Sequence, residues 1–232
     1  MRLHRFYINE KIESGEVEVR DKEILHQWLK VFRLKRGNKV ILFDGSGTDF
    51  VCEIKEIAKN NALLSVAETT DSPAKSPALR VFLFQSVIKK DKFEWVAEKC
   101  TEIGVADFTA VLSERSEKKG LNDDRVKKII KEASEQSGRG TVPEFHGVKN
   151  LRDLFKEKFE MPSFALDMGG EKLQKSKIPH FGEVALFVGP EGGWSEKEIS
   201  FFKERKIAVV SLGSQTLRAE TAAVAAAALL LL

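Results

Sequence analysis

The stretch from Val184 to Thr221 constrains the fold of this chain most, because it contains the same strand, loop and helix design twice. In the first copy, an apolar run over Val184–Val188 ends in the loop Gly189–Gly193, and a helical pattern follows. In the second copy, Ile207–Leu212 ends in Gly213 and its loop, and a helical pattern follows again. Glycine after a parallel strand lets a ligand approach the backbone, and a helix N-terminus favours electron-rich groups. The pattern predicts the floor of a small-molecule site; the alternative is two ordinary strand-to-helix turns.

The residues around these loops refine that prediction. Ser195 and Glu198 have the spacing of a capping box, which fixes the start of the first helix, and the second helix is expected to begin near Glu220. Glu191 lies within the glycine loop and is placed to face a ligand, although a solvated loop carboxylate is the alternative. The loop lacks the Lys-Ser/Thr of a P-loop, and the chain has no GxGxxG, so neither motif supports a P-loop or dinucleotide site.

From Leu79 onward the chain alternates between strand and helix patterns, which indicates a parallel α/β sheet. Gly104 and Gly138 are expected to end the first two helices. Besides the two strands above, the expected strands are Leu79–Val87, Val105–Leu112 and Phe164–Met168, the last ending in Gly169-Gly170. The expected helices are Lys92–Ile103, a helix from the cap Asn122 to Ser137, and a short helix from the cap Asn150 to Phe159.

The first 70 residues have β-type patterns instead. Strands are expected over Lys39–Phe43, Asp49–Ile57 and Ala62–Ala67, and a helix over Lys22–Leu34. Short, closely spaced strands suggest a small barrel or sandwich. Thr69–Pro77 contains two prolines and two serines without apolar periodicity, which favours a linker between two domains.

Composition limits the class of protein and the kind of surface it can present. The chain is 42% hydrophobic and 31% charged, which is typical of a soluble globular protein. Its net charge is only +3, so any nucleic-acid surface must be local. Cys52 and Cys100 lie far apart without a CxxC motif, and the charged N-terminus does not resemble a secretory leader, so a cytoplasmic location is expected.

An apolar run, Ala222–Leu232, closes the sequence. It is shorter than the roughly 18 residues that a membrane-spanning helix needs. A helix that is apolar on every side is expected to be buried between layers or in a subunit interface. We therefore expect a homodimer.

A basic segment follows the first helix. Phe32 and Trp28 are interleaved with cations there, and the segment from Lys30 to Lys39 contains no acidic residue. Such a surface can follow a phosphate backbone while aromatic faces stack on bases. The alternative is a solvated turn whose aliphatic stems cover apolar surface. The cations are Lys30, Arg33, Lys35, Arg36 and Lys39.

Charged residues also follow several predicted strands of the second half. The carboxyl ends of parallel strands meet at one edge of a sheet, so these groups are expected to converge there. Arginines with a carboxylate suit an anionic polymer and the removal of a proton, whereas ordinary ion pairing is the alternative for each group taken singly. The four histidines show no paired spacing, so no metal site is predicted. The segments are Lys89–Lys92, Ser113–Ser116, Glu135–Arg139 and Leu217–Thr221.

Together these motifs resemble the RsmE family of ribosomal RNA methyltransferases. The resemblance is carried by Gly189–Ile199 (GPEGGWSEKEI) and Leu212–Ala222 (LGSQTLRAETA), in that order. Gln215 and Thr216 stand where the family usually has an arginine and an aliphatic residue. Supporting matches are Glu98–Gly104, Ser113–Ser116, Glu135–Arg139 with Val142-Pro143, His4–Tyr7, Phe32-Arg33 and Leu42–Gly45.

This resemblance implies an α/β protein with a small N-terminal PUA-like β-barrel and a C-terminal SPOUT domain containing a trefoil knot. The barrel is expected over residues 1–70, a linker over 71–78 and the SPOUT domain over 79–232. The family binds S-adenosylmethionine, acts as a homodimer, and methylates N3 of a uridine in 16S ribosomal RNA. The alternatives are a knotted-fold ribose methyltransferase acting on tRNA and a non-catalytic RNA-binding assembly factor.

The resemblance also implies roles for individual residues. Glu220 or Glu191 is the candidate acceptor of the uridine N3 proton, and the arginines are candidates for phosphate contact and anion stabilisation. The expected catalytic residues are Arg218, Glu220, Arg139 and Arg115. The expected cofactor contacts are Leu166, Gly189, Glu191, Gly192, Leu212, Gly213, Gln215 and Leu217. The expected RNA contacts are Arg2, Arg5, Lys30, Arg33, Lys35, Arg36, Lys89 and Lys90.

Overall fold

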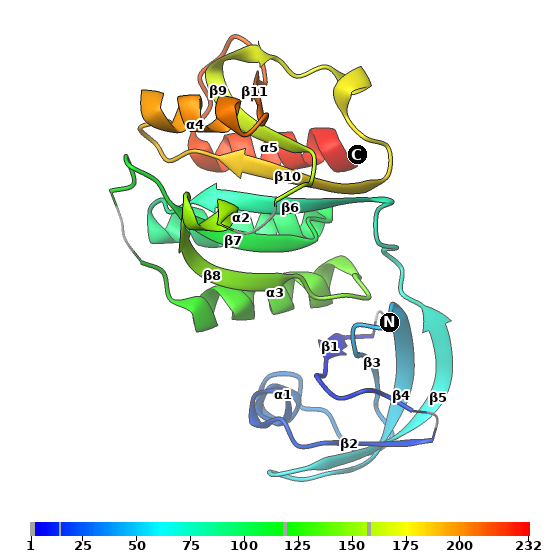
Figure 1. Cartoon of the computed structure of the whole chain (residues 1–232). Coiled ribbons are helices and arrows are strands. Elements are labelled where there is room, and N and C mark those ends of the chain that lie inside the picture. The colour runs from blue at the N-terminus through cyan, green and yellow to red at the C-terminus, as the bar shows by residue number, and fades with distance from the viewer. Residues whose placement is uncertain (1–2, 14, 118–119, 157–158) are drawn as a thin grey trace. The chain divides into compact units, whose positions relative to one another are not determined.

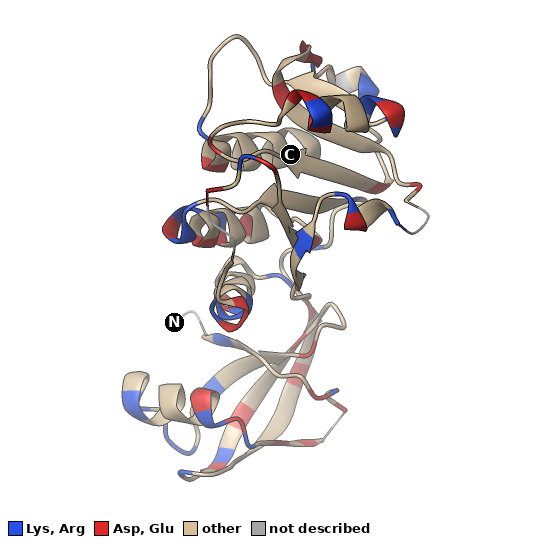
Figure 2. Ribbon diagram, turned by 60° about the vertical axis from the view of Figure 1, so that its left-hand side comes forward, with Lys and Arg blue, Asp and Glu red and all other residues tan. Residues whose placement is uncertain are grey.

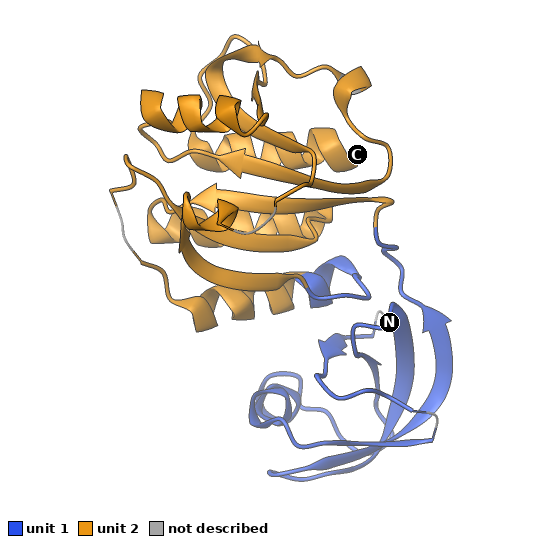
Figure 3. Ribbon diagram, in the orientation of Figure 1, with its two compact units in different colours: residues 1–76, 134–142 blue, residues 77–133, 143–232 orange. Residues whose placement is uncertain are grey.

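The computed structural model describes residues 3–13, 15–117, 120–156 and 159–232. The chain forms two compact units, which are coloured separately in Figure 3. Unit 1 comprises residues 1–76 and 134–142, and unit 2 comprises residues 77–133 and 143–232. Each unit has its own sheet, so each is described by itself below.

Unit 1 contains a curled five-stranded sheet with the order β1-β3-β4-β5-β2 (Figure 1). β1 pairs with β3 in parallel, and the other pairs are antiparallel. The three strands expected from alternation are confirmed, and the last of them continues through Asp71 into the expected linker. The strands are β1 (Arg5–Tyr7), β2 (Glu16–Val19), β3 (Lys39–Phe43), β4 (Thr48–Ile57) and β5 (Ala62–Asp71).

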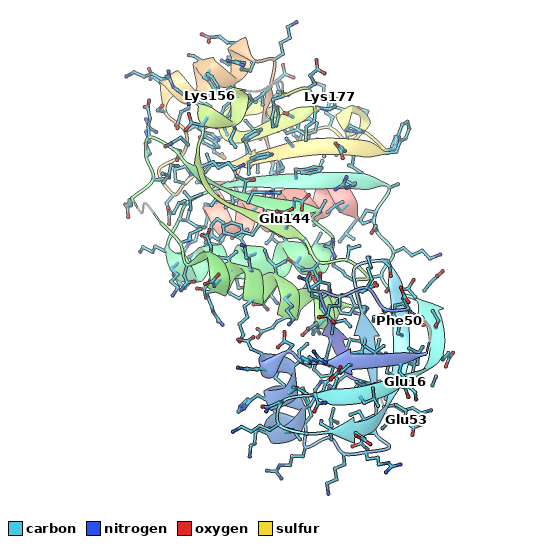
Figure 4. All side chains as sticks on the ribbon, turned by 60° about the horizontal axis from the view of Figure 1, so that its bottom comes forward. Glu16, Phe50, Glu53, Glu144, Lys156 and Lys177 are labelled. Atoms are coloured by element: carbon cyan, nitrogen blue, oxygen red, sulfur yellow. The ribbon has the colours of Figure 1, made fainter. Side chains whose placement is uncertain are left out.

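The core of unit 1 follows from the two-residue period of its strands. On β4, Phe50, Cys52 and Ile54 are buried, whereas the intervening Glu53 is part-exposed and pairs with Lys55. Figure 4 labels Phe50 and Glu53 on this strand. The buried residues belong to one apolar cluster filled from the sheet and from the preceding helical segment.

The helix expected over Lys22–Leu34 is divided in the structure. Asp21 caps a short α-helix, α1 (Lys22–His26), and a π-helical turn, η1 (Gln27–Val31), follows it. The Phe32 amide donates to the Gln27 carbonyl at 2.9 Å, which closes the wider turn. The prediction of one regular helix to Leu34 is therefore wrong beyond His26, since the wider turn replaces the α-helical one where Trp28 is fully buried.

Unit 2 contains a six-stranded sheet in the order β11-β9-β10-β6-β7-β8 (Figure 1). Every pairing in it is parallel, which confirms the expected sheet type. The central strands β10 and β6 are mainly apolar and are buried along most of their length, as expected of strands covered on both faces. The strands are β6 (Leu79–Ser86), β7 (Asp107–Leu112), β8 (Glu144–Asn150), β9 (Ser163–Lys172), β10 (Gly182–Val188) and β11 (Ala208–Ser211).

Helices cover both faces of this sheet. α2 and α5 pack against each other, with α5 against β6 and β10, while α4 packs beside β11 on the opposite face (Figure 1). Gly104 ends α2 with a φ of 117°, and Asn122 caps α3 by accepting from the Arg125 amide at 3.0 Å, both as expected. The helices are α2 (Lys90–Ile103), α3 (Asp123–Ser137), α4 (Glu196–Glu204) and α5 (Ala219–Leu231), with 3-10 turns η2 (Asp153–Phe155) and η3 (Lys175–Lys177).

Two expectations for unit 2 are wrong. The helix expected from Asn150 to Phe159 is absent from its described part, where Asn150 ends strand β8 and only the turn η2 follows. β9 does not end at Gly169-Gly170 but continues to Lys172. A Cβ on Gly170 would lie 2.6 Å from the Val210 nitrogen, so this glycine allows close approach of β11, with a register shift, rather than ending its strand.

The apolar C-terminal run forms α5, as expected. Ala223, Ala226, Ala227 and Leu230 are buried on one side of the helix. Among the helices of the described chain, none has both the length and the apolar character required to cross a membrane.

Candidate active site

A pocket of about 800 Å³ opens at the carboxyl ends of β9, β10 and β11. The loop after β10 and the loop after β11 both line it, so the two glycine loops of the repeated design share one cavity. Its walls combine backbone from these loops with four cations and four acids. The cations are Lys89, Lys92, Arg115 and Arg218, and the acids are Glu117, Asp167, Glu191 and Glu220.

The loop after β10 is held by a buried tryptophan. A Cβ on Gly189 would lie 3.3 Å from the indole of Trp194, so the absence of a side chain lets the ring pack against the backbone. The Trp194 Nε1 donates to the Leu166 carbonyl at 3.0 Å, and this joins the loop to the end of β9. Two walls of the pocket are therefore tied together by one buried hydrogen bond.

The start of α4 is fixed by the capping box that the sequence predicts. The Ser195 amide donates to the Glu198 carboxylate at 2.8 Å, and the Glu198 amide donates to the Ser195 hydroxyl at 3.2 Å. The other carboxylate oxygen of Glu198 accepts from the Glu114 amide at 2.9 Å. Glu198 is only 6% exposed, so it is a buried acceptor shared by the loops after β7 and β10.

The position of Arg115 depends on the hydrogen bond between the Glu114 amide and the Glu198 carboxylate. Its guanidinium donates to the Gly192 carbonyl at 3.0 Å, and the turn that carries it is closed by a 2.8 Å hydrogen bond between the Ser113 and Ser116 hydroxyls. Because Glu198 holds the adjacent Glu114 amide, Arg115 is fixed at the pocket wall from both sides.

The loop after β11 leads directly into α5. Gly213 has a φ of 148°, which favours glycine, and Arg218 is the exposed N-cap residue of α5. Glu220, in the first turn, is 8% exposed, and its carboxylate lies 3.4 Å from the Lys92 ammonium. An acid and a cation from two helices therefore meet inside the pocket.

The four acids of the pocket differ in burial and in what they accept. Glu191 is exposed and accepts from the Lys89 amide at 3.3 Å. Asp167 accepts from the Gly169 amide within its own turn at 2.8 Å. Glu220 alone among the four is buried. Its burial and its charged partner distinguish it as the acid best placed to act on a bound group.

Comparison with known proteins agrees with this geometry. A family model described as an RNA methyltransferase domain matches residues 74–231, and one described as an RNA methyltransferase PUA domain matches residues 29–67. The chain is 33% identical to Ribosomal RNA small subunit methyltransferase E of Synechocystis sp., over 85% of this chain and 67% of that protein. The chain belongs to the ribosomal RNA small subunit methyltransferase E family. This confirms the resemblance inferred from the motifs.

Other members of this family match along nearly the whole chain. The Rickettsia conorii enzyme is 29% identical, over 98% of this chain and 95% of its own. The crystal structure of the Neisseria gonorrhoeae enzyme, solved bound to S-adenosyl methionine, is 30% identical with a TM-score of 0.87, over 98% of this chain and 96% of that one. The curled sheet of unit 1 is thus PUA-like, and the parallel sheet of unit 2 is of the SPOUT type.

Most residues assigned from the family motifs line the pocket. Of the expected cofactor contacts, Gly213 alone is absent from the described lining, and its neighbour Leu212 is present. Of the expected catalytic residues, Arg115, Arg218 and Glu220 line the pocket. Arg139 belongs to unit 1, where it is buried and its backbone pairs with Ala74. The expected cofactor contacts on the lining are Leu166, Gly189, Glu191, Gly192, Leu212, Gln215 and Leu217.

The expected RNA contacts fall into different environments. Lys30, Arg33, Lys35 and Arg36 are exposed, and the structure shows them without ion pairs to any described residue (Figure 2 colours cations blue). Lys89 lines the pocket, and Lys90 is exposed near Glu94 at 3.8 Å. Arg2 lies outside the described residues.

Arg5 is a correction to that set. Its guanidinium is buried, and its Nε donates to Asp49 at 2.8 Å. Its terminal nitrogens also donate to the carbonyls of Ser134, Glu135 and Arg139. Since no part of this side chain faces solvent substantially, it holds unit 1 together and is not available to RNA.

Several lining residues were given no individual role from the sequence, among them Lys92, Glu117, Asp167 and Met168. Lys92 belongs to Lys89–Lys92, one of the segments expected to converge at this edge of the sheet, but it was not assigned a role of its own. Asp167 and Met168 had no signal beyond their place at the end of the apolar run of β9.

Neither cysteine is suited to nucleophilic catalysis. Burial raises the pKa of the Cys52 thiol to about 12 and also raises the pKa of the Cys100 thiol, so both remain protonated at neutral pH. Among the described residues, no three His, Cys, Asp or Glu side chains are grouped to hold a metal ion.

Proposed function

We propose that this chain transfers the methyl group of S-adenosylmethionine to N3 of a uridine in the 16S ribosomal RNA of the small subunit. The observation that carries the proposal is the pocket itself, in which a rim of cations and a buried acid surround backbone walls at three strand ends. The family relatives named for small-subunit ribosomal RNA methylation support the substrate.

The residues of the pocket fit this cofactor. A volume of about 800 Å³ falls within the roughly 300–1,000 Å³ of small-molecule sites. Strand-end backbone at Leu166, Gly189 and Leu212 offers amides and carbonyls to a neutral adenosyl group, and the nearby acids suit its cationic sulfonium and amino groups. The Neisseria gonorrhoeae relative is solved with this molecule bound. When bound, the cofactor supplies an activated methyl group.

The protein side chains would prepare the acceptor. N3 of uridine carries a proton that must leave before its lone pair can attack a methyl carbon. Glu220 is buried at the pocket and is the better candidate for this proton than the exposed Glu191. Arg115 and Arg218 line the same pocket and would contact phosphate and stabilise negative charge on the uracil.

The exposed basic segment of unit 1 would bind the RNA away from the reacting nucleotide. Lys30, Arg33, Lys35 and Arg36 present four cations within a short length of chain. The rings of Phe32 and His4 lie with their centroids 4.2 Å apart at an interplanar angle of 39°, which offers aromatic surface in the same unit. Such contacts give affinity with little dependence on base sequence.

Two further properties belong to the proposal. We infer a cytoplasmic homodimer. The dimer is supported by the side of α5 that is not buried in the protomer, where Val224 and Leu229 are partly exposed and Ala225 is exposed. An apolar surface of this kind is commonly covered by a second subunit. Sedimentation or light scattering at several concentrations would test the dimer, and a monomer at all of them would contradict it.

Methyl transfer to unmodified 16S RNA and to small-subunit particles tests the function directly. Methylation at N3 blocks the pairing edge of the base, so reverse transcription should stop at the modified nucleotide. A tRNA ribose methyltransferase would instead modify tRNA and leave the pairing edge intact. A non-catalytic assembly factor would bind RNA without transferring a methyl group, and stabilisation by S-adenosylmethionine in a melting assay separates it from cofactor users.

A further inference from the structure

Lys92 and Glu220 form an ion pair inside the pocket. The ammonium of Lys92, in the first turn of α2, lies 3.4 Å from the carboxylate of Glu220, in the first turn of α5. The two side chains are 39% and 10% exposed, and both line the cavity. The pair therefore faces the space that a ligand would fill.

Buried neighbours fix both partners. Phe93, next to Lys92, is 1% exposed, and the amides of both residues donate to the Lys89 carbonyl at 2.9 Å. Ala219 and Ala223 are buried on the other helix, where α5 packs against α2. Because both backbones are anchored, the fold keeps the two side chains within reach of each other.

Lys92 differs from the other three cations of the pocket. Lys89, Arg115 and Arg218 are exposed, and Arg115 already donates to the Gly192 carbonyl. Lys92 alone is partly buried, and it is the cation that contacts the buried acid. A charge in a partly desolvated site interacts more strongly with a developing charge than an exposed one does.

We propose that Lys92 is a further catalytic residue, which stabilises the uracil anion formed when Glu220 accepts the N3 proton. This inference rests on the proposed function. Before the step, the pair of Lys92 and Glu220 is neutral in sum. When the N3–H bond breaks, a new O–H bond forms on Glu220, which becomes neutral. Lys92 then keeps its positive charge beside the newly formed anion.

The methyl-transfer step that follows needs no further reactant. The N3 lone pair forms the bond to the methyl carbon, and the carbon–sulfur bond breaks with its electron pair remaining on sulfur. The proton on Glu220 is released to solvent after the product leaves. Lys92 changes its principal partner from carboxylate to uracil, so its contribution is greater in the transition state than in the ground state.

The test uses the full-length protein with S-adenosylmethionine and 16S RNA. Lys92→Met removes the charge at similar length, Lys92→Gln is a polar second choice in case the first variant folds poorly, and Lys92→Arg keeps the charge. We expect the two neutral variants to lower the single-turnover transfer rate about 100-fold or more, with cofactor affinity by calorimetry near wild type. Lys92→Arg should recover part of the rate. Lys99→Met is the matched control, since Lys99 lies on the same helix and is paired with Glu98 and Glu102 away from the pocket.

The double variant Lys92→Met/Glu220→Gln separates catalysis from structure. If the pair acts in catalysis, the double variant stays as slow as the slower single variant. If the ion pair is only structural, each single change lowers activity and melting temperature, and the double variant, which removes both charges, restores them. That restoration, or wild-type transfer by a neutral Lys92 variant, would overturn the proposal. A wild-type protein that fails to bind cofactor or to methylate RNA would instead reject the proposed function.

Discussion

Each unit of this protein contains a buried carboxylate paired with a cation, and the two pairs differ in how completely their polar atoms are occupied. In unit 1, Arg5 donates to Asp49 and to three backbone carbonyls, and the Ser72 hydroxyl also donates to Asp49 at 2.6 Å. In unit 2, Glu220 contacts Lys92 at 3.4 Å, and both line a cavity. The polar atoms of the first pair, which we call the saturated pair, are occupied by protein partners, whereas those of the second pair can still form hydrogen bonds with a ligand.

This difference indicates what each pair does. A buried charge whose hydrogen-bonding capacity is filled by the protein stabilises one conformation and has little left to offer a substrate. A buried charge beside a cavity, with a single charged partner, can exchange that partner for a bound group. We therefore expect the occupancy of the polar atoms, more than burial alone, to distinguish structural from functional charges in this chain.

The largest effect is expected when the saturated pair is broken. Arg5→Met leaves Asp49 buried without its cation, and we expect a loss of about 3–5 kcal/mol in the free energy of unfolding. Urea denaturation monitored by circular dichroism measures it. Arg20→Met is the control, since Arg20 forms an exposed pair with Glu18, and its unfolding midpoint should hardly change. Equal midpoints for both variants would show that the saturated pair does not stabilise unit 1.

A smaller effect, on rate rather than stability, is expected at Arg218. This residue is exposed at the pocket, and the described structure gives its side chain no hydrogen bond or ion pair. Arg218→Ala should leave cofactor affinity near normal and reduce methyl transfer about 100-fold, since a stabilising charge acts only on the reacting RNA. Arg80→Ala, at the opposite end of the strands, is the control. Transfer near the wild-type rate would remove Arg218 from the catalytic set.

The same contrast explains how much the sequence could predict. The glycine loops and the Ser195–Glu198 capping box were predictable because their conformations depend on residues a few positions apart. The assignment of Arg5 to RNA failed, and Lys92 was given no role of its own, because the partner of each side chain is distant in sequence: Asp49 for Arg5 and Glu220 for Lys92. Because those partners cannot be identified from the sequence, Arg5 was assigned to RNA, and Lys92 was named only as part of the segment Lys89–Lys92.

The fold shows the same limit. Alternation of elements predicted a parallel sheet, yet it did not predict that β9 lies between β10 and β11. The continuation of β9 through Gly170 depends on the backbone of the neighbouring strand at Val209 and Val210. The trefoil knot was implied only by family resemblance and stays a prediction, since no local pattern specifies how a chain is threaded.

Glu198 provides an intermediate case, a saturated carboxylate next to the pocket. Glu198→Gln replaces one of its two accepting oxygens by a donor, so the Ser195 amide or the Glu114 amide loses its acceptor. We expect a loss of about 1–3 kcal/mol in stability, and weaker transfer because the loop that carries Arg115 is released. Thermal unfolding and single-turnover rates measure the two effects.

The matched control for that change is Glu196→Gln. Glu196 lies in the same first turn of α4 and is exposed, so it carries the same charge near the helix N-terminus without the buried acceptor role. It should change stability by no more than about 0.5 kcal/mol. If the two variants behave alike, the charge at the helix end matters and the link between the loops does not.

The smallest effect is expected for charges with no partner among the described residues. Neutralising Arg33 and Arg36 should leave stability unchanged and weaken RNA binding, since both side chains are exposed. If each contacts one phosphate, the slope of log affinity against log salt concentration should fall by about 1–2. Lys55→Met/Lys59→Met removes two cations from β4 and the turn after it, and its slope should match the wild type. An unchanged slope for the Arg33/Arg36 variant would mean that these two cations are solvated and do not contact RNA phosphates. The absence of protein partners would then not be enough to identify a charged side chain that binds RNA.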